Sequence, residues 1–166
     1  VMIAITFIDY DALISKVRYG FFAVSVGLIL LVKVFGRGSL GNSNWISIGP
    51  VSIQPTEFVK ITFMITFALH LSKVRNKINN PLTVLGLAAH GGFIIALLLW
   101  QGDLGMTLVY MAIMAIMMFG AGLSLWYFAG VGAVGLIASP FIWNHLSTNQ
   151  QNRILFGFNP DLDPLD

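Results

Sequence analysis

The sequence predicts an all-α fold, a polytopic bundle of transmembrane helices. Hydrophobic residues make up 57% of the 166 residues and charged residues only 10%, whereas soluble domains carry roughly 25% charged residues. The chain also contains long apolar runs of the length that crosses a bilayer core, about 20 residues. A net charge of +2 gives no reason to expect a nucleic-acid partner. The absence of cysteine excludes disulfides and cysteine metal sites.

Five apolar segments are long enough to span the membrane. Residues 1–8 are also apolar but too short, and they have neither the charged start nor the cleavage site of a signal peptide. We therefore expect 1–8 to be part of a sixth helix, and residues 1–166 to be a single membrane domain, a fragment of a longer protein. The five predicted spans are residues 19–35, 56–71, 82–100, 104–120 and 125–143.

Polar and turn-forming residues bound these spans. Pro55 precedes the second span, where a first-turn proline is tolerated because its missing N–H would be unpaired there anyway. Asp103 precedes the fourth span, where the helix dipole favours a carboxylate. The other boundaries are the charged stretch 9–18 before the first span, the polar loop 73–80 before the third and the turn 121–124 before the fifth.

The Lys and Arg residues predict the orientation of the bundle. Cytoplasmic loops carry more Lys and Arg than outer loops, so the more basic side is assigned to the cytoplasm. The loop 36–55 and the tail 144–166 then face outward. The basic side holds Lys16, Arg18, Lys73, Arg75 and Lys77, and the other side holds Lys33, Arg37 and Arg153.

Glu57 and Lys60 are the first candidate site residues. They lie three positions apart on one face of the second span, where ionisable side chains are costly in lipid and predict a functional site. The alternative is an ion pair that only neutralises two charges. Asp103 is the next candidate, and its alternative is a plain helix cap.

The tail supplies the remaining candidate carboxylates. Asp161, Asp163 and Asp166 follow Arg153, although such a run is also typical of a solvated loop. None of the three histidines of the chain has a second ligand at the spacing of a zinc site. The chain also contains no phosphate-binding P-loop and no Gly-x-Ser-x-Gly nucleophile motif.

Four stretches of the chain carry motifs that can be compared with a known family. They are Phe7-Ile-Asp-Tyr10, Trp45 to Lys60 with its Gln-Pro-Thr-Glu, Gln101-Gly-Asp-Leu-Gly105, and Arg153 to Leu165 with its Asn-Pro-Asp-Leu-Asp-Pro-Leu. In this order and at these intervals, they resemble the SEDS family of polytopic cell-wall proteins, the RodA, FtsW and SpoVE group. The resemblance covers essentially the entire chain. Four positions depart from the usual family pattern: Asn44, Gly102, Asn159 and Asp166.

The resemblance implies a fold of roughly ten helices and a peptidoglycan glycosyltransferase. Such an enzyme polymerises lipid II at the outer face of the bacterial cytoplasmic membrane, with a class B penicillin-binding protein as its transpeptidase partner. The sequence leaves open whether it serves elongation, division or sporulation. A flippase for lipid-linked precursors is the alternative function, because charges inside a helix bundle are also typical of transporters. A non-catalytic division scaffold is a third.

The resemblance and the chemistry of glycosyl transfer together assign roles to the candidate residues. A carboxylate can take the proton of the acceptor hydroxyl. Asp163 is the first choice by motif, and Asp161 is the second. Positive charge must stabilise the departing diphosphate, supplied by Lys or Arg or by a divalent cation, Mg²⁺ or Mn²⁺, bound to carboxylates. The predicted substrate-binding residues are Trp45, Gln54, Glu57, Lys60, Asp103 and Arg153.

Overall fold

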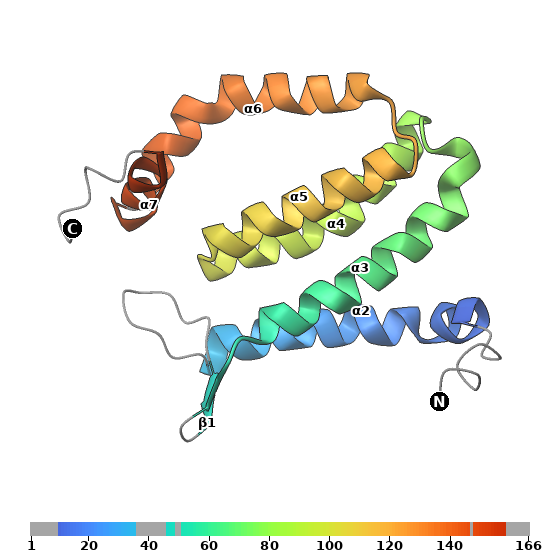
Figure 1. Cartoon of the computed structure of the whole chain (residues 1–166), viewed down its shortest axis with the longest axis horizontal. Helices are drawn as coiled ribbons and strands as arrows, with labels where there is room; N and C mark the ends of the chain where they lie inside the picture. The colour runs from blue at the N-terminus through green and yellow to red at the C-terminus, as the bar shows by residue number, and fades with distance from the viewer. Residues whose placement is uncertain (1–9, 36–45, 49–50, 147, 159–166) are drawn as a thin grey trace. The chain divides into compact units, whose positions relative to one another are not determined.

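The structure is a computed structural model that describes residues 10–35, 46–48, 51–146 and 148–158 (Figure 1). It confirms the all-α prediction, since each of the five predicted spans falls within one helix. The helices are α2 (Tyr10–Phe35), α3 (Pro55–Val74), α4 (Pro81–Gln101), α5 (Leu104–Gly120), α6 (Leu125–His145) and α7 (Thr148–Phe158), with a short 3₁₀ helix, η2 (Arg75–Lys77), after α3.

The structure adds a β-hairpin and a helix that were not predicted from the sequence. Strands β1 (Ile46–Ile48) and β2 (Val51–Ile53) pair antiparallel, with Ile46 opposite Ile53. They form a small hairpin within the predicted outward loop 36–55. Helix α7 lies within the tail 144–166, for which the sequence predicts only a loop. The predicted partial span 1–8 lies outside the described residues.

The chain divides into two compact units, 1–123 and 124–166. In the first unit, α3 is the central helix, because it contacts α2, α4 and α5, while α4 also contacts α2 and α5. Small and apolar side chains fill the space between these helices, as is usual where lipid surrounds a bundle. The most deeply buried apolar side chains are Ile29, Val32, Val59, Phe63, Phe67, Leu87, Ile94, Leu98 and Tyr110.

The first unit has two chemically different ends, because successive helices run in opposite directions (Figure 1). The end of α2, the start of α3, the end of α4 and the start of α5 meet at one end. We call it the Asp103 end, defined by Lys33, Gln54, Trp100 and Asp103. The opposite end, the Lys73 end, is defined by Tyr19, Lys73, Arg75 and Lys77.

The second unit consists of α6 and α7. The side-chain amide of Gln151 in α7 donates a hydrogen bond of 2.8 Å to the carbonyl of Trp143 in α6. Helix α6 buries none of its residues within the structure and contains Pro140 in its interior. The apolar surface of α6 is thus suited to contact with lipid or with other helices.

By length and composition, α4 and α6 qualify as helices that could cross a membrane. Tyr19–Val34 and Leu104–Gly120 are shorter apolar helices, and α3 carries Glu57 and Lys60 in its first two turns. The chain is thus a polytopic membrane protein in composition and fold, and the count of five spans stays a prediction.

Candidate functional site

The turn between α4 and α5 positions Asp103. Gly102 ends α4 in the left-handed conformation, with φ of 89°, and its N–H donates to the carbonyls of Leu98 and Leu99. Glycine adopts this conformation without the steric cost that other residues meet. Asp103 then caps α5, because one of its carboxylate oxygens accepts a 3.0 Å hydrogen bond from the N–H of Met106.

The second oxygen of Asp103 faces α3. It accepts a hydrogen bond of 3.4 Å from the side-chain amide of Gln54, the residue that precedes α3. Asp103 is only 6% exposed, so this carboxylate is held by contacts from two helices. The structure therefore confirms that Asp103 starts a helix, and it also joins Asp103 to Gln54, two residues that the sequence analysis listed separately.

A second link joins the same two helices one layer deeper. The hydroxyl of Tyr110 in α5 donates a 2.9 Å hydrogen bond to the backbone carbonyl of Thr56 in α3. Thr107 donates to the carbonyl of Asp103 at 2.7 Å. Thr56, Thr107 and Tyr110 are all buried. Together with Gln54 and Asp103 they form a polar layer between the starts of α3 and α5.

Glu57 and Lys60 form the ion pair that their spacing predicted. The ammonium of Lys60 lies 2.8 Å from a carboxylate oxygen of Glu57. The Glu57 side chain is 54% exposed and that of Lys60 is 23% exposed. The pair therefore lies on the surface of the bundle, at the first turns of α3, and both charges are accessible to a ligand from outside the bundle.

Sequence reasoning missed Gln101 and Thr56 as site residues. Gln101 is 4% exposed, and neither polar atom of its side chain has a hydrogen-bond partner within the described part of the chain. The hydroxyl of Thr56 is likewise buried and unpartnered there. Leaving such a group unpaired costs about 1–3 kcal/mol. Their places inside the Gln-Gly-Asp and Gln-Pro-Thr-Glu motifs are the signal that could have identified them.

Lys33 brings a second cation to the Asp103 end. Its ammonium donates a 3.1 Å hydrogen bond to the carbonyl of Trp100 and lies 5.1 Å from the centre of the Trp100 ring. This contact places a positive charge at the last turn of α4, where the helix dipole favours a cation. It also ties the end of α2 to the end of α4.

The remaining predicted site residues lie outside the described residues or in the second unit. Trp45, Asp161 and Asp163 lie outside the described residues, and Arg153 lies on α7, in the second unit. Their predicted roles stay predictions. The first unit thus brings together Gln54, Glu57, Lys60 and Asp103 at one end, as the topology predicted from Lys and Arg requires.

The described residues do not by themselves fit a divalent cation. Within the described ranges, no group of three His, Asp or Glu side chains could hold a metal ion. Of the carboxylates at the Asp103 end, Glu57 is paired with Lys60 and Asp103 is bonded to Met106 and Gln54. The prediction of Mg²⁺ or Mn²⁺ therefore depends on the tail aspartates.

Comparison with known proteins places the whole chain beside one family. The FtsW, RodA and SpoVE profile, described as a cell cycle protein, matches residues 1–166. A probable peptidoglycan glycosyltransferase FtsW of Haemophilus influenzae is 32% identical over 142 residues, which are 82% of this chain and 34% of that protein. Its counterpart in Allochromatium vinosum is 34% identical over 161 residues, 88% of this chain and 37% of that protein. The chain therefore spans little more than a third of these curated relatives.

The chain is also similar to a chain of known structure. That structure is reported under the words "Structural coordination of polymerization and crosslinking by a peptidoglycan synthase complex". The alignment has a TM-score of 0.77 and 28% sequence identity, and it covers 96% of this chain and 47% of the other. The arrangement of helices described above is thus one that a larger membrane protein adopts.

Proposed function

This chain belongs to the FtsW, RodA and SpoVE family of cell cycle proteins, and from this we propose that the complete protein is a peptidoglycan glycosyltransferase. It would polymerise lipid II at the outer face of the bacterial cytoplasmic membrane. The observation that carries the proposal is the family match over the whole chain. The polar layer at the Asp103 end, which the positive-inside rule places outside, supports it.

Glycosyl transfer sets the chemical requirements of the site. A base removes the proton of an acceptor sugar hydroxyl, a bond forms between that oxygen and the anomeric carbon of the donor, and the bond from that carbon to the diphosphate breaks. The base is a carboxylate in this proposal, Asp163 first and Asp161 second. The diphosphate leaves with negative charge, which positioned cations stabilise.

Lys60 and Arg153 are the proposed contacts of the diphosphate. The ion pair with Glu57 holds the Lys60 ammonium at the first turns of α3. Glu57 would thus position Lys60 or bind the acceptor, and Trp45 and Gln54 would line the same region.

A class B penicillin-binding protein is the proposed partner, acting as transpeptidase. The support is the similarity to a chain from a complex that coordinates polymerization and crosslinking. Co-purification of the complete protein with the partner encoded in the same organism tests this part separately from the chemistry.

The test of the function is polymerisation of fluorescent lipid II by the purified complete protein, resolved as glycan chains on a gel. Asp163→Asn is nearly isosteric but removes the basic oxygen, so we expect at least a ~10²-fold loss of rate, with a milder effect of Asp161→Asn. Loss only with Asp161→Asn would assign the base to the other carboxylate. Normal activity of both variants would remove the tail aspartates Asp161 and Asp163 from the mechanism.

A parallel assay separates the enzyme from the transporter alternative. Movement of labelled lipid II across proteoliposomes without polymer would favour a flippase, whereas polymer formed without added ATP or ion gradient favours the glycosyltransferase. Polymerisation activity in EDTA at a concentration on the order of millimolar tests the predicted divalent cation. Full activity after chelation would remove the metal from the proposal.

A further inference from the structure

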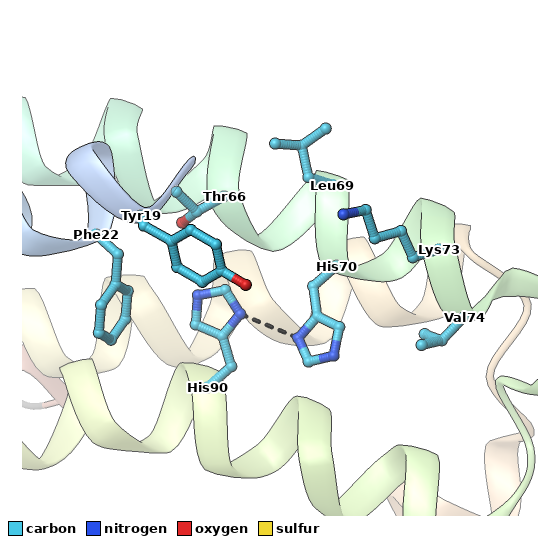
Figure 2. A pocket seen from close by; sticks show the side chains of 8 residues that line it. All are labelled: Tyr19, Phe22, Thr66, Leu69, His70, Lys73, Val74 and His90. Carbon is cyan, nitrogen blue, oxygen red and sulfur yellow. Dashed lines mark hydrogen bonds between the residues drawn. The ribbon is translucent and has the colours of Figure 1, made fainter. Parts of the chain in front are cut away.

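A cavity of about 620 Å³ lies at the Lys73 end of the first unit, far along the bundle from the residues of the proposed active site. Its size is within the range of about 300–1,000 Å³ that small-molecule sites have. Figure 2 shows that α2, α3 and α4 all contribute side chains to it. The lining residues are Tyr19, Phe22, Thr66, Leu69, His70, Lys73, Val74 and His90.

On the predicted topology, the cavity would extend from the membrane surface to about the depth of one leaflet. Lys73 lies in the last turn of α3, next to the basic helix η2. His90 lies nine residues after Pro81, the first residue of α4, which is about 14 Å along the helix. One leaflet contributes about 15 Å, half of the hydrocarbon thickness. A ligand here would have one end at the surface and the other near the middle of the bilayer.

The surface end of the cavity is positively charged. Lys73 lines it, and the exposed residues Arg75 and Lys77 follow in η2. Lys73, Arg75 and Lys77 thus give this end three positive charges among the described residues. Basic pockets between transmembrane helices on the cytoplasmic side are suited to anionic head groups.

Below the lysine, the cavity is apolar except for a few hydrogen-bonding side chains. The Nδ1 atoms of His70 and His90 lie 3.1 Å apart, and Figure 2 marks this contact. The Nε2 atom of His90 is buried and has no hydrogen-bond partner among the described residues. This nitrogen is enclosed by protein, so the polar groups that line the cavity below Lys73 are those of Tyr19, Thr66 and the His70–His90 pair.

The aromatic surroundings fix His90 in this position. Its ring makes edge-on contacts with Phe22, Phe63 and Phe67, at centroid distances of 5.4, 6.4 and 5.5 Å. A histidine held rigidly by packing presents its nitrogen at one place, which favours a specific contact over a mobile one.

We propose that this cavity binds an anionic phospholipid from the leaflet at the Lys73 end, which is the cytoplasmic leaflet on the proposed topology. The phosphate contacts Lys73, the glycerol ester region reaches the His70–His90 pair, and an acyl chain lies along Phe22 and Leu69. The cavity shares no residue with the Asp103 end, so the proposal does not depend on the glycosyltransferase function.

The test is quenching of a tryptophan by brominated lipids in vesicles that contain the complete protein. Phe22→Trp places the probe in the cavity, and Ile137→Trp places a control probe on the 80% exposed Ile137 of α6; the native tryptophans give a common background. We expect brominated phosphatidylglycerol to quench the Phe22→Trp probe more strongly than brominated phosphatidylcholine, with no such preference at Ile137→Trp. Equal quenching by both lipids at the cavity would reduce the site to unselective lipid contact and overturn the proposal.

Charge variants in the Phe22→Trp background identify the anion contact. Lys73→Gln should lower the preference for phosphatidylglycerol about fivefold, the effect of one basic residue at the surface. Lys77→Gln removes the same charge outside the cavity and should change it little. His90→Phe keeps a ring in the aromatic cluster and should weaken binding without changing charge. Equal effects of Lys73→Gln and Lys77→Gln would contradict a specific site.

Two further outcomes decide the identity of the occupant. Millimolar inorganic phosphate should not reverse the quenching, because it lacks the acyl chain; complete reversal would assign the cavity to a soluble anion instead. An absence of quenching at Phe22→Trp, with normal quenching at Ile137→Trp, would show that another segment of protein fills the cavity. Thermal unfolding of each variant, compared with the Phe22→Trp parent, establishes that the variants are folded.

Discussion

Asp103 uses its two carboxylate oxygens for two different contacts. One oxygen caps α5 through Met106, and the other accepts from Gln54 across the helix interface. A capping role needs only a side-chain oxygen, which asparagine also provides. A role in substrate binding depends on the negative charge. The two roles can therefore be separated by substitution.

We expect Asp103→Ala to destabilise the protein by about 1 kcal/mol through loss of the cap, with a further cost from the unpaired Gln54 amide. Asp103→Asn should keep most of the stability and lose polymerisation activity if the charge contacts substrate. Thermal unfolding in detergent and lipid II polymerisation are measured on both variants. Full activity of Asp103→Asn would leave Asp103 with a capping role only.

Substitution can also separate the structural and functional roles of the ion pair of Glu57 and Lys60. An exposed pair contributes only about 0–1 kcal/mol to stability, and the Glu57 side chain is more than half exposed. A large functional effect would then have a cause other than folding.

We predict that Lys60→Ala lowers polymerisation by about 10²-fold or more, as expected for loss of a cation that stabilises a leaving group, while the unfolding midpoint changes little. Lys77→Ala at the opposite end is the matched control and should keep its activity. The double variant Glu57→Ala/Lys60→Ala should remain as inactive as Lys60→Ala. Recovery of activity in the double variant would mean that the pair is only architectural.

At the scale of the elements, α4 and α5 approach closely at Gly91. A Cβ atom at this position would overlap the sulfur of Met114, whereas one at the neighbouring Gly92 would meet nothing within 4 Å. Small residues allow transmembrane helices to pack this closely. The two adjacent glycines therefore differ in what an added methyl group does.

Gly91→Ala should destabilise the protein by about 1 kcal/mol, the low end of the usual cost of overpacking, because the flexible Met114 side chain can move aside. Gly92→Ala should be neutral or stabilising, because alanine favours a helix over glycine by about 1 kcal/mol. The unfolding midpoints of both variants check this. Met114→Ala should suppress the effect of Gly91→Ala. Additive losses in the double variant would show that the two residues do not interact.

The helices were easier to predict from the sequence than the small elements, because polar or turn residues bound their long apolar runs. Helix α5 begins and ends at the predicted residues, Leu104 and Gly120, since polar or turn residues bound its apolar run. The Ile-Ser-Ile and Val-Ser-Ile runs of β1 and β2 do alternate with the period of a strand, but three residues are too short to stand out. Helix α7 has a polar composition, so a search for membrane spans passes over it.

The candidate site was predictable where its contacts are local. The spacing of Glu57 and Lys60 indicates their ion pair, and the position of Asp103 indicates a helix start. The contacts Gln54–Asp103 and Tyr110–Thr56 join residues 49 and 54 positions apart. Such contacts depend on how helices pack, and neither composition nor periodicity determines that. The contact between His70 and His90 escaped prediction for the same reason.

At the scale of the whole molecule, the two ends of the first unit should face opposite sides of the membrane. The prediction follows from the excess of Lys and Arg at the Lys73 end. Single cysteines at Ile53→Cys, near the Asp103 end, and at Asn76→Cys in η2 can test it, because both positions are exposed and the chain has no native cysteine.

An impermeant thiol reagent applied to intact cells should label Ile53→Cys and leave Asn76→Cys unlabelled until the membrane is opened. The readout is the mass shift of the complete protein on a gel. Labelling of Asn76→Cys from outside would invert the topology, and with it the assignment of the Asp103 end to the outer face.

The tight turn between α4 and α5 also bears on how the protein is made. Only Gly102 and Asp103 separate the two helices, so we expect α4 and α5 to enter the bilayer together as a helical hairpin with Asp103 at its tip. Asp103 is the one Asp, Glu, Lys or Arg between residues 81 and 120, and carrying a charge through the membrane centre costs about 2.5–3.5 kcal/mol on insertion scales. The hydrogen bond from the Met106 N–H lies within the hairpin itself, so the carboxylate can cross already partly solvated by its own backbone before α3 supplies Gln54.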